Sequence, residues 1–121
     1  MARTADEMLF RSTTLLGTAF GVAGVLAPDA LGDLYGIDDH SPDNRFMTRL
    51  WGGRTALVGA LTLLATPGRD RRNLLVALAA QDVLDTVSAL TTHGLSNRAR
   101  NGAAATTAAF AAVTAYLASR E

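Results

Sequence analysis

Long runs of apolar residues, each flanked by charged positions, dominate the pattern along the chain. No formally charged residue occurs at positions 12–28, 55–68 or 101–119, and positions 73–97 contain only two aspartates. A bilayer core of about 30 Å is crossed by about 20 helical residues. The pattern therefore predicts four membrane-spanning helices, near residues 8–27, 46–66, 74–93 and 101–119, joined by short connections except the first.

A soluble helical bundle is the alternative fold, because the mean hydropathy is only +0.18. Soluble helices, however, carry a polar stripe with a period of about 3.6 residues. Residues 15–27 offer only Thr18 as a polar side chain, which favours the membrane. We expect an all-α, up-down-up-down bundle of four transmembrane helices, forming a single domain over residues 1–121 of a multi-pass protein of the cell membrane.

The connecting segments predict an orientation, because arginine accumulates on the cytoplasmic side of short loops. Residues 68–73 read GRDRRN, whereas residues 28–45 hold five Asp and a single Arg. We expect both termini to be cytoplasmic, a topology that leaves Arg98 and Arg100 outside. The first apolar run is expected to be a retained helix rather than a cleaved signal peptide, since Pro28 follows it directly.

Composition narrows the function classes. The 11 basic residues are all Arg and are balanced by 11 acidic residues, so no basic tract predicts nucleic-acid binding. The absence of Cys excludes disulfides and thiolate chemistry. Small residues at four-residue intervals, as at Gly17 and Gly21 or Gly52 and Ala56, predict close helix packing, and the alanine-rich fourth segment is expected to be a smooth packing surface.

Three charged residues interrupt the second and third apolar segments. A charge inside a bilayer is costly unless it is paired or faces a wet cavity. If these segments form a hairpin that turns near Asp70, Arg54 and Asp85 lie at nearly the same depth, and Asp82 lies one turn from Asp85 on the same face. We therefore expect Arg54 to reach Asp85 or Asp82. Because one Arg faces two carboxyls, we expect one aspartate to be ionised and the other protonated.

Other side chains complete the predicted site. Trp51, Gln81 and Ser88 are the expected substrate contacts, with Trp51 close enough to Arg54 to stack on it or line a pocket. The Asp-x-x-Asp spacing has no histidine partner at a useful distance, so no metal ligand set is predicted. No cofactor is expected either.

The sequence also resembles a known family. The runs GVAGVLAPDALGDLYGID at residues 21–38, WGGRTALVGALTLL at residues 51–64 and QDVLDTVSAL at residues 81–90 resemble a domain-of-unknown-function family of small four-helix bacterial integral membrane proteins. The resemblance covers roughly residues 17–90. It implies the four-helix fold and adds weight to Arg54 and to Asp82 or Asp85. Because the family is uncharacterised, the resemblance implies no reaction.

Three functions are compatible with such a site. The favoured hypothesis is a cofactor-independent acid–base enzyme, of the isomerase, cyclase or epoxide-opening type, that acts on a lipophilic small molecule through Asp82, Asp85 and Arg54. The second is a proton-coupled small transporter, which would need a homo-oligomer to form a pathway. The third is a structural or assembly protein in which the charges only fix helix packing. The lipid bilayer is the other expected partner.

Overall fold

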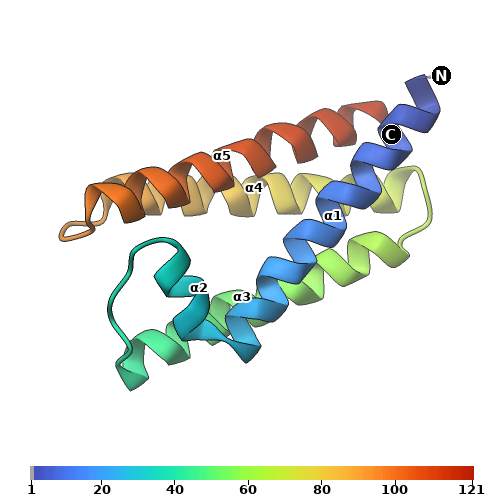
Figure 1. The fold of residues 1–121 in the computed structure, drawn as a ribbon. Helices are drawn as coiled ribbons and strands as arrows, with labels where there is room; N and C mark the ends of the chain where they lie inside the picture. Colours follow the sequence, from blue (N-terminus) through green and yellow to red (C-terminus); the bar gives the residue numbers. More distant parts are fainter. Residues whose placement is uncertain (1) are drawn as a thin grey trace.

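The computed structural model describes residues 2–121 and is entirely helical, with short connecting segments (Figure 1). The helices are α1 (Ala2–Leu26), α2 (Pro28–Leu34), α3 (Pro42–Leu64), α4 (Arg69–Thr91) and α5 (Asn97–Arg120). The predicted all-α class is therefore correct. The predicted count of four helices is wrong, because the described part of the chain forms five.

The additional helix, α2, lies in the acidic first connection, between the first two predicted helices. Pro28 occupies its first turn, where a missing amide proton costs nothing, and Asp29 lies beside the positive end of the helix dipole. The helix ends at Leu34 with Tyr35 as its C-cap, and Gly36 follows with a φ of 74°, a conformation that favours glycine. These local signals were present in the sequence but span only seven residues, too few for a periodic pattern.

The number of candidate membrane spans also differs from the prediction. Three helices are long and apolar enough to cross a membrane: Thr4–Leu26, Arg69–Thr91 and Asn97–Arg120. Among the described helices, α3 does not reach that hydropathy, because every stretch of it long enough to cross a membrane contains both Arg49 and Arg54. Charged and small residues lower its apolar character. The predicted bundle of four spanning helices is thus replaced by three apolar helices and a more polar α3.

Side chains at the helix starts explain why α3 and α5 begin earlier than predicted. Ser41 and Ser96 each occupy the N-cap, and their hydroxyl oxygens accept hydrogen bonds from the amides of Asn44 and Ala99. Such caps satisfy amide groups that the first helical turn leaves without partners. The polar residues that follow each cap belong to the helices, although the apolar pattern begins only later.

The helices are arranged as two pairs, α1 with α3 and α4 with α5 (Figure 1). Glycine allows α1 and α3 to approach closely: a Cβ atom on Gly52 would lie only 2.5 Å from the carbonyl oxygen of Gly21. The predicted packing role of Gly21 and Gly52 agrees with this contact. Both chain ends lie at the same end of the molecule, near the α3–α4 turn.

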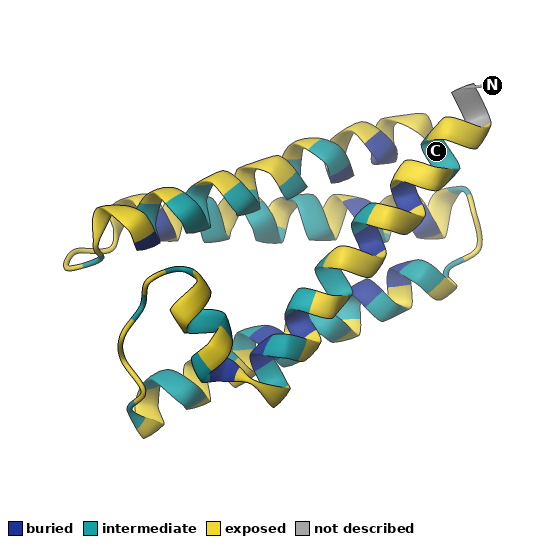
Figure 2. Cartoon of the chain, in the orientation of Figure 1, coloured by how far each residue is buried: buried dark blue, intermediate teal, exposed yellow. Residues whose placement is uncertain are grey.

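A small apolar core joins the two pairs at that end. It consists of Phe10, Leu75, Leu117 and Ala118. Elsewhere the outward faces are largely exposed (Figure 2), and they include many large apolar side chains, such as Leu26 at 77% and Leu64 at 84% exposed. Apolar side chains exposed on this scale are typical of a surface that faces lipid or a partner.

Candidate functional site

A cavity of about 270 Å³ lies between the two helix pairs, within reach of α1, α3, α4, α5 and the end of α2. Its volume is near the lower end of the range for small-molecule sites. Most of its lining surface is apolar, and the lining residues on α4 run from Leu78 to Ser88, a length of about 15 Å at 1.5 Å per residue. The cavity is lined by Thr14, Gly17, Thr18, Phe20, Tyr35, Trp51, Thr55, Gly59, Leu78, Gln81, Asp82, Asp85, Ser88, Ala103, Thr106, Thr107, Phe110 and Thr114.

Asp85 is the more strongly partnered of the two carboxyls. The Nε1 of Trp51 donates a hydrogen bond of 3.2 Å to its Oδ2, and the Nη2 of Arg54 lies 3.7 Å from its Oδ1. The ion pair expected between the second and third apolar segments is therefore present. At 3.7 Å the guanidinium is beyond ordinary hydrogen-bond distance, so the contact is mainly one of charge.

Arg54 itself occupies a different place from the one predicted. Its side chain is 56% exposed and is not among the residues that line the cavity. It approaches Asp85 from α3. Arg54 was expected among the catalytic residues, and the structure places it beside Asp85 but not on the cavity wall. Of the two roles expected for Trp51, stacking on Arg54 or lining a pocket, the structure shows the second: Trp51 lines the cavity and donates a hydrogen bond to Asp85.

Asp82 lies one turn before Asp85 on the same face of α4, and both line the cavity. In the described part of the chain, the carboxyl of Asp82 has neither a hydrogen-bond partner nor a basic partner within 4.0 Å. Only its backbone carbonyl is engaged, by the Thr86 hydroxyl at 2.7 Å. The two carboxyls thus share a cavity but differ in their surroundings.

The other predicted contact residues also lie on the cavity wall. Gln81 donates a hydrogen bond of 3.1 Å from its Nε2 to the Oγ1 of Thr55, linking α4 to α3. Ser88 lies on the wall one turn beyond Asp85. The structure therefore gathers Trp51, Gln81 and Ser88 around the two aspartates, as the spacing along α4 and the hairpin suggested.

Several wall residues were not predicted from the sequence, above all those of α5. That helix was expected to be a smooth packing surface, but it contributes Ala103, Thr106, Thr107, Phe110 and Thr114 to the cavity. The wall positions 103, 106–107, 110 and 114 recur every three or four residues, and the threonine hydroxyls among them were the signal within an alanine-rich run. Alanine leaves room beside them, so the threonines and the phenylalanine form the wall.

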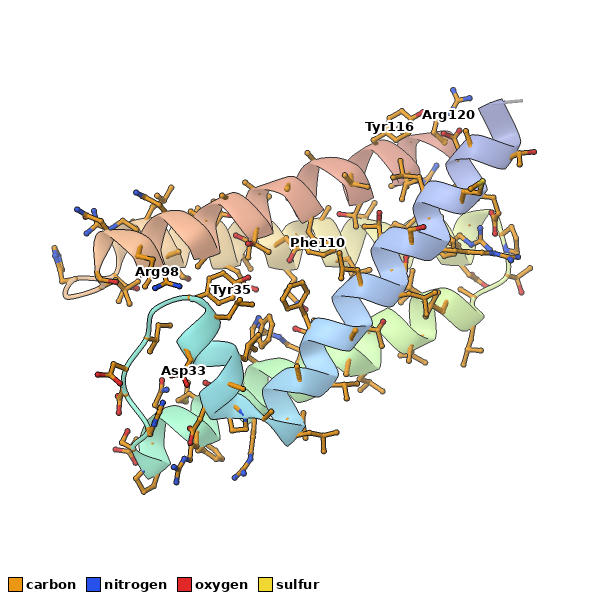
Figure 3. All side chains as sticks on the ribbon, in the orientation of Figure 1. Asp33, Tyr35, Arg98, Phe110, Tyr116 and Arg120 are labelled. Atoms are coloured by element: carbon orange, nitrogen blue, oxygen red, sulfur yellow. The ribbon has the colours of Figure 1, made fainter. Side chains whose placement is uncertain are left out.

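Aromatic side chains bound the cavity toward α2. The hydroxyl of Tyr35 donates a hydrogen bond of 3.1 Å to the Oγ1 of Thr106, which ties the end of α2 to α5. Figure 3 shows Tyr35 reaching from α2 toward α5, near Arg98. The rings of Phe20 and Phe110 meet edge to face, with centroids 6.3 Å apart. Such contacts are favourable for aromatic pairs.

The acidic segment beside α2 is held together by ion pairs. The Nε of Arg45 donates to both carboxylate oxygens of Asp29, at 3.0 and 3.1 Å, and its Nη2 donates to Oδ2 at 2.8 Å. This contact lowers the pKa of Asp29 below its usual value. The ring of His40 lies 2.9 Å from the Asp33 carboxylate, which raises the pKa of His40. Asp33 and His40 are exposed, Asp29 and Arg45 are half-buried, and all four lie outside the cavity, so they hold α2 in place rather than form part of the site.

A second polar cluster lies at the end where the termini meet. Arg71 was expected to be part of a solvated cytoplasmic loop, but it lies in the first turn of α4 and is 7% exposed. Its Nη1 pairs with Glu7 at 3.0 Å and with Glu121 at 3.3 Å, and its guanidinium stacks 4.0 Å from the centre of the Phe10 ring. The pairing indicates that Arg71 stabilises this end of the bundle, which we call the closed end.

Among the described residues, no group of three or more His, Asp or Glu side chains is placed to hold a metal ion. Comparison with protein-family models, curated proteins and solved structures finds no match to this chain. The resemblance to the four-helix membrane family stays a prediction from the sequence. We therefore infer the function from the geometry of the cavity.

Proposed function

We propose that the protein is a membrane-associated enzyme that performs acid–base chemistry on a lipophilic small molecule bound between the two helix pairs. The observation that carries this proposal is the pair Asp82 and Asp85, which line one apolar cavity with unlike partners. Enzymes that need an acid and a base at the same pH obtain them by giving two titratable groups different environments.

The partners suggest which carboxyl plays each role. An ionised carboxylate without a counter-charge is disfavoured in an apolar cavity, so Asp82 is the group that would hold a proton. Asp85 has the charge of Arg54 and a hydrogen bond from Trp51 to support its ionised form. Asp82 is thus the proposed general acid and Asp85 the proposed general base.

The two carboxyls together can catalyse an isomerisation by proton transfer. Asp82 gives its proton to one end of a double bond in the substrate. The Asp85 carboxylate removes a proton from the atom next to the other end, so the double bond moves by one position. The product has the composition of the substrate. The proton then returns from Asp85 to Asp82 across one helical turn, which restores the starting state. Cyclisation uses the same two roles, and epoxide opening would add a water activated by Asp85.

The cavity wall suits a lipophilic substrate. Its surface is mainly apolar, and the rings of Phe20, Phe110 and Trp51 offer flat contacts. The volume admits a small molecule rather than a folded partner. The exposed apolar side chains on the outer faces of the helices would favour insertion into the lipid bilayer, in which such a substrate dissolves.

The test measures turnover by the purified protein in lipid nanodiscs. The nanodiscs are incubated in heavy water with a lipid extract of the cells that produce the protein. Mass spectrometry would detect products of unchanged composition that carry deuterium from the exchangeable carboxyl. We expect Asp82→Asn and Asp85→Asn each to reduce the rate by at least ~100-fold, the usual scale for losing a general acid or base.

Asp70→Asn is the matched control, because Asp70 lies on the same helix but is exposed and outside the cavity. It should react at the wild-type rate. Full activity in both cavity variants, or absence of any deuterated product with the wild type, would contradict the proposed function.

A further inference from the structure

The hydroxyl of Thr14 is a second polar feature of the cavity. Thr14 lies on α1, is only 4% exposed and lines the cavity wall. Within the described residues its Oγ1 has no hydrogen-bond partner. Buried polar groups in folded proteins nearly always have a partner, and a group without one indicates a missing water or ligand.

The other threonines on the cavity walls of α1 and α5 behave differently. Thr18, Thr106, Thr107 and Thr114 each donate to a carbonyl oxygen of their own helix, at 2.7, 2.9, 2.9 and 2.8 Å. That bond is the usual way for a buried threonine in a helix to satisfy its hydroxyl. Thr14 does not make it, so its buried hydroxyl lacks the hydrogen bond that the other wall threonines have.

The position of Thr14 separates it from the two carboxyls. It follows the core residue Phe10 by one turn of α1, and Leu78 follows the core residue Leu75 by nearly one turn of α4. Asp82 and Asp85 lie further along α4, about 6 and 10 Å beyond Leu78 at 1.5 Å per residue. Thr14 therefore lies toward the closed end of the cavity, and the carboxyls lie toward its middle.

We propose that Thr14 binds an oxygen atom of the ligand, so that the ligand is an oxygenated lipophile, an alcohol or a ketone, rather than a hydrocarbon. This inference rests on the proposed ligand site. The oxygen would lie at the closed end, several carbon atoms from the part of the molecule that meets the carboxyls. A hydroxyl can donate to a ketone and can both donate to and accept from an alcohol, so either group satisfies Thr14.

Trp51 provides a direct assay, because it is the one Trp of the chain and lines the cavity. The probes are 1-dodecanol, 2-dodecanone and dodecane, titrated into nanodiscs that contain the wild type while Trp51 emission is recorded. The dissociation constants are expressed as the mole fraction of each probe in the lipid and are then compared. We expect the wild type to bind the alcohol or the ketone about 3- to 10-fold more tightly than the alkane, the scale of one hydrogen bond.

Thr14→Val keeps the shape of the side chain and removes its hydroxyl. It should abolish the preference for the oxygenated probes and leave the affinity for dodecane unchanged. Thr14→Ser should retain the preference, and so should Thr13→Val, which makes the same change on the neighbouring residue outside the cavity wall. If the valine variant does not fold, the comparison of Thr14→Ala with Thr14→Ser replaces it.

Two results would overturn the inference. One is a preference for oxygenated probes that persists without the Thr14 hydroxyl, which would indicate that the hydroxyl serves only a water or the fold. The other is the absence of any response of Trp51 to the oxygenated probes in the wild type. Neither result depends on the Asp82 and Asp85 variants, so this inference and the proposed enzyme activity can fail separately.

Discussion

Gly52→Ala should force α1 and α3 apart and destabilise the protein. A Cβ atom at this position would lie 2.5 Å from the carbonyl oxygen of Gly21 and 2.9 Å from the backbone of Gly24 and Val25. Backbone atoms cannot rotate away as a flexible side chain can, so the helices themselves must move.

The magnitude follows from two opposing effects. Overpacking at a tight contact typically costs about 1–3 kcal/mol. Replacing glycine by alanine inside a helix returns about 1 kcal/mol. Gly53→Ala is the matched control, because its new methyl group would meet only the Val25 Cγ2 atom, at 4.0 Å. Both variants share the propensity gain, so their unfolding free energies should differ by about 1–3 kcal/mol, with Gly53→Ala the more stable.

The assay is unfolding in mixed micelles by titration with sodium dodecyl sulfate, followed by the helical circular dichroism signal. Because Trp51 adjoins Gly52, movement of α3 should also change the tryptophan emission of Gly52→Ala more than that of Gly53→Ala. Equal stability of the two variants would refute the close α1–α3 crossing, and with it the position of the cavity wall that α3 provides.

The remaining predictions concern groups outside the cavity. Arg71→Ala should lower the unfolding free energy by about 2 kcal/mol, since it removes a charged hydrogen bond, a second ion pair and a ring contact from a buried side chain. Arg72→Ala on the exposed neighbour should have little effect, and equal losses in chemical unfolding would contradict this. The contact with Asp33 raises the pKa of His40. The contact therefore stabilises the fold fully below the ordinary His pKa, and this stabilisation is lost as the pH rises through the raised pKa. Nuclear magnetic resonance titration should find a lower His40 pKa in Asp33→Asn, and an unchanged pKa would exclude the contact.

The sequence predicted the part of the site that depends on position along helices. Arg54 and Asp85 pair because two antiparallel helices around a short turn place residues equidistant from it side by side. The fixed rise of a helix makes such an estimate reliable even when its exact start is misjudged. The same regularity brings Gln81, Asp82 and Ser88 onto one wall with Asp85.

Other parts of the structure depend on contacts that no local pattern encodes. The burial of Arg71 arises because Glu7 and Glu121, from the two ends of the described chain, meet at the α3–α4 turn. The cavity-lining role of α5 depends on how far the two helix pairs separate. Tyr35 reaches Thr106 across 71 positions of sequence, through a short helix that the periodicity could not detect.

In the proposed site one carboxyl of the cavity pair holds a proton while the other is ionised. Infrared titration near neutral pH tests this without a substrate, because a protonated carboxyl absorbs as a carboxylic acid. We expect an acid band in the wild type that is lost in Asp82→Asn and retained in Asp85→Asn and Asp70→Asn. Absence of the band from the wild type, or its persistence in Asp82→Asn, would rule out this division of the proton.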